Sequence, residues 1–339
     1  MRKYKIFIFP IAVFLLLISA CTNYAADSEI TAAKPFAEDN NIAESDEISV
    51  TKVLIKSENG DLGMEHFTME NGKRVYYYIP ESVKNSSEER VPLVLFMCGT
   101  TCDPVDDCVN SGWTELAEKE NFVVISPDYN NYATYSETGF LISVVEYMIG
   151  NYPIDTERIY STGFSNGGTA SVALTRDYPQ YFAAISAMGW MIDLDNKNGI
   201  FEKYDMPFQV IQGDGEFTEK TEAGTIRVMN DEVDGIRSMM LYNEMISQDY
   251  TPDYEKTPYW GYAPDETQKL FLNNREWDIC SYFKEGYSSP FAQLIIVEDS
   301  NHRPRPEEAE FAWDFFKNFK RVNGGKIIEE NKINQKISE

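Results

Sequence analysis

Hydrophobic residues recur in short, nearly unbroken runs along the chain, and segments with helical spacing separate these runs. The runs are typical of strands buried on both faces and occupy residues 92–97, 122–126, 159–162, 182–187, 207–212 and 293–297. The helical segments are 111–120, 140–149, 169–175, 229–246 and 307–320. Strands that alternate with helices predict an α/β fold, with a mostly parallel, twisted sheet covered by helices on both faces.

A hairpin is predicted ahead of the first of these strands. Residues 64–70 and 73–79 are expected to form its two strands. Asn71-Gly72 between them is a favoured two-residue hairpin turn, because both residues tolerate a positive φ. The sheet is therefore expected to begin with antiparallel strands.

Residues 248–287 break this alternation. The segment is irregular and rich in aromatic residues, among them Tyr250, Tyr254, Tyr259, Trp260, Tyr262, Phe271 and Trp277. Long irregular segments of compact domains are often lids or binding loops, and these rings would then stack on a sugar or an aryl acid. The sequence is equally consistent with packing of the rings into a satellite core.

Residues 1–20 have the composition of a signal peptide. Met1-Arg2-Lys3-Tyr4-Lys5 is basic, and residues 6–17 are apolar apart from Pro10, a stretch too short to remain as a membrane span. Leu17-Ile18-Ser19-Ala20-Cys21 resembles the lipobox of bacterial lipoproteins. The resemblance implies a lipid on Cys21 and a cell-envelope protein, anchored to a bacterial membrane and facing outside the cytoplasm. Ordinary secretion is the alternative.

Three segments follow the signal peptide. Residues 21–50 are acidic and lack apolar periodicity, which predicts a disordered tether. Residues 51–325 are expected to form a single α/β domain, which is a normal size for this class. Residues 326–339 have the composition of a frayed polar tail.

The 339-residue chain has a formal net charge of -25, which argues against nucleic acid as a partner. It contains two histidines and lacks a Cys-x-x-Cys pair, so neither a zinc site nor another metal or cofactor is expected. Cys102 and Cys108 flank an acidic segment and are the favoured disulfide pair in an exported protein. Free thiols are the competing interpretation.

The strongest chemical signal is Gly163-Phe164-Ser165-Asn166-Gly167, a G-x-S-x-G pattern. It directly follows the buried run 159–162 and precedes the small, apolar segment 169–175. Strand, sharp turn and helix together are the context of a nucleophile elbow, which holds the serine hydroxyl clear of its neighbours. The helix N-terminus also favours developing negative charge. Ser165 is therefore the predicted nucleophile; a chance match in a glycine-rich turn is the alternative.

A serine hydroxyl needs a base, and the sequence offers only His66 and His302. His66 lies in the predicted hairpin, whereas His302 follows the last buried strand at the correct end of the sheet, which makes it the predicted base. The orienting acid is expected between the serine and the histidine, in Gly213-Asp214-Gly215-Glu216. Glu216 is favoured, because the tight turn must end before a side chain can reach back. Asp214 is a rival, and both acids could be solvated.

The oxyanion site requires two N–H donors. Asn166, directly after Ser165, is expected to supply one of them. Thr100, in the loop that follows the strand 92–97, is expected to supply the other.

Four stretches of the chain are familiar: Val91-Pro92-Leu93-Val94-Leu95, Asp155-x-x-Arg158-Ile159-Tyr160, Gly163-Phe164-Ser165-Asn166-Gly167-Gly168 and Tyr178-Pro179-x-x-Phe182-Ala183-Ala184. Together they resemble secreted esterases of the polyhydroxyalkanoate depolymerase and feruloyl esterase type, within the α/β-hydrolase superfamily. The likeness covers about residues 70–320. It implies the α/β-hydrolase fold, with Ser165 as nucleophile, His302 as base and the acid at Glu216.

The sequence departs from that family at three places. Cys98-Gly99 stands where His-Gly is usual, and Glu216 stands where an aspartate is usual. Arg303-Pro304-Arg305-Pro306 follows His302 in a region that usually carries an aromatic residue, which indicates an altered substrate preference.

The leading hypothesis is a lipid-anchored, extracytoplasmic serine esterase that cleaves carboxylic esters through an acyl-enzyme. Its expected substrates are small-molecule or polysaccharide-linked esters, such as feruloyl or acetyl groups on plant polysaccharide, or polyhydroxyalkanoate-like esters. This choice rests on the family resemblance and on export. A serine peptidase on the same fold and a surface binding protein with a decayed site are the alternatives.

Overall fold

The computed structural model describes residues 63–84, 90–190, 204–216, 218–222, 224–228 and 230–330, without the side chains of 230–232. All of these residues belong to one compact unit, Glu47–Glu339. The predicted signal peptide, the lipid attachment site Cys21 and the acidic tether lie outside the described residues. The first residues of the predicted domain and residues 331–339 of the predicted tail also lie outside them.

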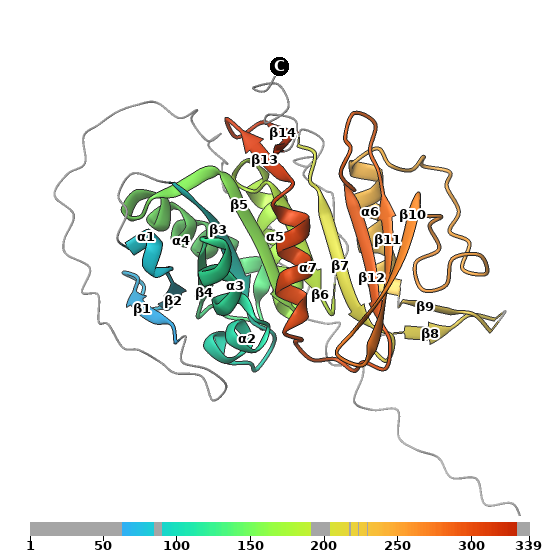
Figure 1. The fold of residues 1–339 in the computed structure, drawn as a ribbon, viewed down its shortest axis with the longest axis horizontal. Coiled ribbons are helices and arrows are strands. Elements are labelled where there is room, and N and C mark those ends of the chain that lie inside the picture. The colour runs from blue at the N-terminus through green and yellow to red at the C-terminus, as the bar shows by residue number, and fades with distance from the viewer. Residues whose placement is uncertain are drawn as a thin grey trace, which may run out of the picture. The chain divides into compact units, whose positions relative to one another are not determined.

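A ten-stranded sheet forms the centre of this unit (Figure 1). Its parallel middle part has the order β4-β3-β5-β6-β7-β12. These strands are β3 (Val91–Met97), β4 (Val123–Pro127), β5 (Ile154–Phe164), β6 (Ala184–Met188), β7 (Phe208–Gly213) and β12 (Ala292–Val297). Every residue of β3, β4, β6 and β7 is buried, which explains their unbroken apolar runs and confirms the predicted mostly parallel sheet.

Antiparallel strands extend the sheet at both ends. β1 (Glu65–Thr68) and β2 (Arg74–Tyr78) form the predicted hairpin, and β2 pairs antiparallel with β4. At the opposite end, β11 (Arg275–Tyr282) pairs with β12, and β10 (Glu266–Leu272) forms the edge. The sequence did not predict this second hairpin, because β10 is largely exposed and has no buried apolar face.

Helices cover both faces of the sheet. α3 (Trp113–Glu120) packs against α7 (Glu307–Phe316) on the face drawn in front in Figure 1. α4 (Thr138–Asn151) packs against α5 (Asn166–Asp177). The other helical elements are α1 (Glu81–Lys84), α2 (Pro104–Asn110), α6 (Asn230–Tyr242), η1 (Thr134–Ser136) and η2 (Pro179–Tyr181).

The apolar stripe of α7 explains why this helix docks on the sheet. Phe316 stacks on Tyr160 of β5 with ring centres 4.8 Å apart, and Trp313 stacks on Phe122 at 4.3 Å. Aromatic pairs with this geometry stabilise a core by about 1 kcal/mol beyond the area that they bury. The predicted amphipathic helix is therefore present, and its last turn ends earlier than expected.

The C-terminal segment corrects the prediction of a tail that begins at residue 326. Phe319–Val322 forms β13, which pairs with β14 (Lys326–Glu329). Ile327 is buried, and the Glu329 carboxylate accepts backbone N–H groups of Ser288 and Ser289. These contacts hold the first four residues of the expected tail in a short ribbon.

The aromatic residues of the irregular segment mostly pack inside the protein. Trp260, Tyr262 and Trp277 are buried, and Tyr250 stacks on Tyr262. Phe271 on β10 is the exception, with 72% of its surface exposed. Trp260 and Tyr262 join the main hydrophobic core and Trp277 joins a smaller cluster, so the structure favours core packing over a lid lined by these rings. A small ribbon of β8 (Thr218–Lys220) and β9 (Ile226–Val228) lies in the preceding part of the chain.

Candidate active site

Ser165 occupies a one-residue turn between β5 and α5. Its φ of 55° and ψ of -119° form a backbone conformation that residues other than glycine rarely adopt. The neighbouring Gly167 allows this turn, because a Cβ on Gly167 would lie 1.9 Å from the Met97 carbonyl oxygen. Glycine thus lets α5 begin directly against β3, and the turn projects Ser165 at the carboxyl edge of the parallel strands.

The structure brings Ser165, His302 and Glu216 into one hydrogen-bonded series. The Ser165 Oγ lies 2.9 Å from His302 Nε2, and His302 Nδ1 lies 2.5 Å from Glu216 Oε2. These residues follow β5, β12 and β7, whose carboxyl ends share one edge of the sheet. The Glu216 side chain is fully buried, whereas that of His302 is 32% exposed. A proton on Nδ1 leaves the Nε2 lone pair free to accept the serine hydroxyl.

Two further residues shape the space around the imidazole. The Phe164 ring lies 4.6 Å from the His302 ring, centre to centre. Gly189, with a φ of 69°, leaves room behind it, since a Cβ there would stand 3.0 Å from Glu216 Oε2 and 3.2 Å from His302 Cε1. No sequence pattern marks this role of Gly189, because only the folded chain brings it next to His302.

Asp214, the rival acid, has a different partner. Its Oδ1 accepts the backbone N–H of Ser300 at 3.1 Å, which ties the loop after β7 to the loop that carries His302. Glu216 instead turns back toward the sheet, where its Oε1 also accepts the Gly213 N–H at 2.7 Å. His66 lies in β1 beside the Tyr76 ring, at the far edge of the sheet from β12.

The expected oxyanion donors are neighbours. Asn166 is the first residue of α5, where a helix provides no acceptor for the backbone N–H. The Asn166 side chain donates to Thr100 Oγ1 at 2.5 Å and to the Asn131 carbonyl at 3.0 Å. The start of the helix and the loop after β3 are thus joined beside Ser165.

Side chains from α2 and from the loop after β4 hold the Cys98-Gly99 segment in place. The Asp107 carboxylate accepts the Gly99 N–H at 3.1 Å, and the Tyr129 hydroxyl donates to the Cys98 carbonyl at 2.8 Å. Burial raises the pKa of Asp107. The sequence indicated that this loop lacks the usual histidine, but it did not show which residues take over its support.

The predicted Cys102–Cys108 disulfide is wrong, because both cysteines are free. The prediction treated the intervening residues as a loop, whereas α2 begins at Pro104 and Asp103 caps its first N–H groups. The helix turns Cys108 into the core, while Cys102 stays in the loop beside Gly99. Burial raises the pKa of Cys98 to about 12 and that of Cys102 to about 11, so both thiols are neutral near pH 7.

The acetyl xylan esterase from Aspergillus awamori superposes with a TM-score of 0.51 at 17% identity, covering 75% of this chain and 99% of that structure. The chain has the α/β-hydrolase fold. Ser165, Glu216 and His302 stand in that order along the chain, at the carboxyl ends of the parallel strands β5, β7 and β12.

Sequence comparisons agree with an α/β-hydrolase. The Prolyl oligopeptidase family matches residues 130–214. Acetylxylan esterase A of Aspergillus ficuum is 25% identical over 227 residues, or 58% of this chain and 72% of that protein. The bifunctional acetylxylan esterase/xylanase of Neocallimastix patriciarum is 32% identical over 103 residues (29% of this chain), and feruloyl esterase B of Talaromyces funiculosus is 26% identical over 132 residues (35% of this chain). The matches span only 15% and 36% of these last two proteins.

The α/β-hydrolase core carries a pocket of about 410 Å³ beside the nucleophile turn. Its walls come from the η1 region, from the start of α5 and from the end of β6: Tyr132, Ala133, Thr134, Tyr135, Ser136, Asn166, Thr169 and Trp190. Tyr132 and Tyr135 are 73% and 51% exposed. Exposed aromatic rings beside hydroxyl groups suit a ligand with both a flat face and polar edges.

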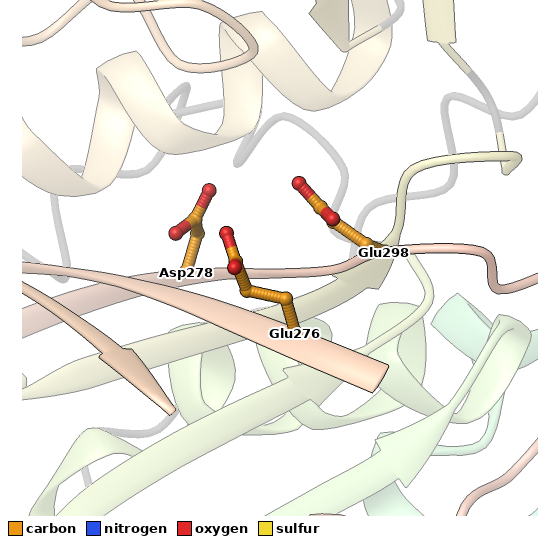
Figure 2. Close-up of side chains that lie close together, drawn as sticks. All are labelled: Glu276, Asp278 and Glu298. Carbon is orange, nitrogen blue, oxygen red and sulfur yellow. The ribbon is translucent and has the colours of Figure 1, made fainter. Parts of the chain in front are cut away.

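A group of carboxylates lies where β11 begins and β12 ends. Glu276, Asp278 and Glu298 lie close together in Figure 2, and one carboxylate oxygen from each lies within 4.8 Å of the other two. Lys269 on β10 forms ion pairs with Glu276 and Asp278. Burial raises the pKa of Glu298, and the charges of Glu276 and Asp278 raise it further. Since Lys269 already supplies a cation, this group by itself does not indicate a metal site.

Proposed function

We propose that this protein is a serine hydrolase of carboxylic esters, with Ser165 as nucleophile, His302 as general base and Glu216 as the orienting acid. The hydrogen-bonded series from Ser165 through His302 to buried Glu216 carries the proposal. Several relatives are acetylxylan or feruloyl esterases by name, which supports an ester as the substrate.

The proposed reaction begins when the Ser165 Oγ attacks the ester carbonyl carbon and its proton moves to His302 Nε2. Glu216 stabilises the imidazolium, and the N–H groups of Asn166 and Thr100 bind the oxyanion. His302 then gives the proton to the departing alkoxide, which leaves as an alcohol. Water attacks the acyl-enzyme in the same way, and the carboxylic acid departs as Ser165 regains its proton.

The proposed substrates are acetyl or feruloyl esters on plant polysaccharide, or related hydroxyalkanoate esters. The names of the relatives support the first two, and the pocket beside Asn166 supports a substrate with a ring, because the exposed side chains of Tyr132 and Tyr135 line it. In the proposed complex, the ester carbonyl of the substrate lies at Ser165 and the ring of the substrate lies toward η1.

The proposed location is the outer side of a bacterial membrane, with a lipid on Cys21. This part of the proposal rests on residues 1–21, which resemble a lipoprotein signal and lie outside the described residues. Within the described part of the chain, no helix has the length and apolar character needed to cross a bilayer.

A serine peptidase is the second candidate, because the match to the Prolyl oligopeptidase family includes the nucleophile turn. The described residues form one large sheet and two small ribbons, without a β-propeller in that part of the chain. Turnover of peptide anilides in preference to aryl esters would support this candidate.

The test is turnover of aryl acetate, feruloyl and hydroxybutyrate esters by the wild type and by Ser165→Ala. We expect the variant to lose activity on the order of 10⁴-fold or more, with a nearly unchanged melting temperature. Ser143→Ala is the matched control, since Ser143 lies on α4 and donates to the Phe140 carbonyl. Full activity of Ser165→Ala would end the proposal.

A further inference from the structure

Arg305 lies in the core directly behind Glu216. It is 2% exposed, and its Nη2 lies 2.5 Å from Glu216 Oε1, the oxygen that His302 does not use. The sequence suggested that this arginine alters substrate preference. Its burial corrects that interpretation for Arg305, because its guanidinium contacts the acid of the site instead of the surface.

Each nitrogen of the Arg305 guanidinium has a hydrogen-bond acceptor. Nε donates to Ser300 Oγ at 2.6 Å, and Nη2 also donates to the Asn301 carbonyl at 3.0 Å. Nη1 donates to Oε1 of Glu308, a buried residue in the first turn of α7. A planar guanidinium held at all three nitrogens has a fixed orientation, so it also fixes the carboxylate to which it binds.

Glu308 offers a negative charge that can offset the positive charge of Arg305. A lone buried guanidinium beside Glu216 would compete with the imidazolium of His302 for the same negative charge. When Glu308 is ionised, it offsets that guanidinium, so two carboxylates face Arg305 before proton transfer. When His302 becomes a cation, the buried group holds two cations and two carboxylates and is balanced.

The ionisation of this group reflects its burial. Burial raises the pKa of Glu308 to about 7, and Glu216 raises it further, while Arg305 acts in the opposite direction. For Arg305, burial alone would lower the pKa, but Glu308 and Glu216 together raise it. Arg305 therefore stays charged, and the charge on Glu308 changes near neutral pH.

We propose that Arg305 and Glu308 are positioning residues for the Ser165–His302–Glu216 series. Arg305 holds Glu216 with Oε2 toward His302, and Glu308 offsets the charge of Arg305. The catalytic meaning of this arrangement rests on the proposed function, whereas its effect on the imidazole can be measured without substrate.

The test uses NMR titration of His302 in a His66→Gln background, which leaves a single imidazole in the chain. Glu308→Gln is compared with Glu310→Gln, which removes an exposed carboxylate from the same helix. We expect Glu308→Gln to move the His302 titration midpoint down by up to about half a pH unit, because the ionised fraction of Glu308, which favours the imidazolium, is lost. Glu310→Gln should leave the midpoint in place.

The kinetic readout separates positioning from a purely structural role. With an aryl acetate above pH 7, where Glu308 is ionised, Glu308→Gln should lower kcat several-fold at unchanged KM. It should also move the acid limb of the pH profile by the same amount as the imidazole midpoint. Equal midpoints and equal kcat values for Glu308→Gln and Glu310→Gln would overturn the proposal.

A second variant covers the case in which Glu308→Gln fails to fold. Arg305→Met with Glu308→Leu replaces the buried ion pair by apolar side chains, a change that proteins often tolerate. We expect a folded protein with kcat lowered about 10-fold at unchanged KM; wild-type kcat in this variant would overturn the proposal.

Failure of this inference and failure of the proposed function give different results. A shifted midpoint in a protein that turns over none of the esters would retain the positioning role and reject the esterase. Ester turnover with an unmoved midpoint and unchanged kcat would retain the esterase and reject the positioning role.

Discussion

Two groups of the molecule combine carboxylates with one basic side chain, and they differ in burial. Glu216 and Glu308 share Arg305 in the core behind His302. Glu276 and Asp278, drawn in Figure 2, share Lys269 on the outer strands of the sheet. The Lys269 side chain is 63% exposed, whereas the side chains of both acids in the first group are completely covered.

The difference shows that position, and not residue type, gives an acid its role in this chain. An exposed ion pair contributes about 0–1 kcal/mol to folding, because water screens it. Breaking a buried pair costs about 3–5 kcal/mol, because one charge remains without a partner. The chain has 55 acidic residues, so its composition alone could not single out Glu216.

The largest expected effect contrasts one acid from each group. Glu216→Gln should lower kcat about 10⁴-fold, because the amide cannot stabilise the imidazolium and favours the wrong tautomer. Glu276→Gln should keep wild-type activity. Steady-state kinetics on an aryl ester measures both variants, and equal activities would break the comparison.

The next effect concerns the two basic residues. Arg305→Met alone should lower the free energy of unfolding by about 3–5 kcal/mol, because it leaves two buried carboxylates without their cation. Lys269→Met should change it by less than about 1 kcal/mol. Urea unfolding provides both values, and a loss of similar size in the two variants would contradict the role given to burial.

A smaller effect is the pH dependence of stability. The pKa of Glu308 is about 7 in the folded protein, against an ordinary value of 4.5, so the folded state holds a proton that the unfolded chain has released between these pH values. This contribution is complete below pH 4.5 and is lost as the pH rises through 7. Between pH 4.5 and 7, the free energy of unfolding of the wild type should fall by up to about 3 kcal/mol relative to that of Glu308→Gln.

Unfolding of the wild type and Glu308→Gln at several pH values measures this loss. Glu310→Gln is the matched control, since it removes an exposed carboxylate from the same helix, and it should keep the wild-type pH slope. A constant difference between the wild type and Glu308→Gln across the window would contradict the assigned ionisation.

The sequence predicted the buried strands and the turn at Ser165, because short stretches of chain determine both. Strands buried on both faces leave apolar runs, and β3 and β7 could therefore be placed within a residue or two. The glycines around Ser165 serve a turn of one residue, so the pattern of that turn is visible in the chain itself. His302 followed by elimination, because the chain offers only one other histidine.

The remaining features carry weak local signals or depend on contacts between distant segments. Arg305 could not be assigned to Glu216, because 88 intervening residues separate the two along the chain and only the packing of α7 brings them together. The edge strand β10 lacks an apolar face, and the disulfide prediction failed because α2 separates the two thiols. Only the pairing of Arg305 with Glu216 depends on a tertiary contact; the other two features come from a short helix and an exposed strand with weak local signals.

The central claim is that His302 and buried Glu216 activate the hydroxyl of Ser165. A fluorophosphonate probe tests it most directly, since the reaction needs an activated serine and no knowledge of the natural substrate. The probe should label the folded wild type once, on the peptide that contains Ser165, and it should label neither Ser165→Ala nor His302→Ala. Folded wild-type protein without a label at Ser165 would contradict the account.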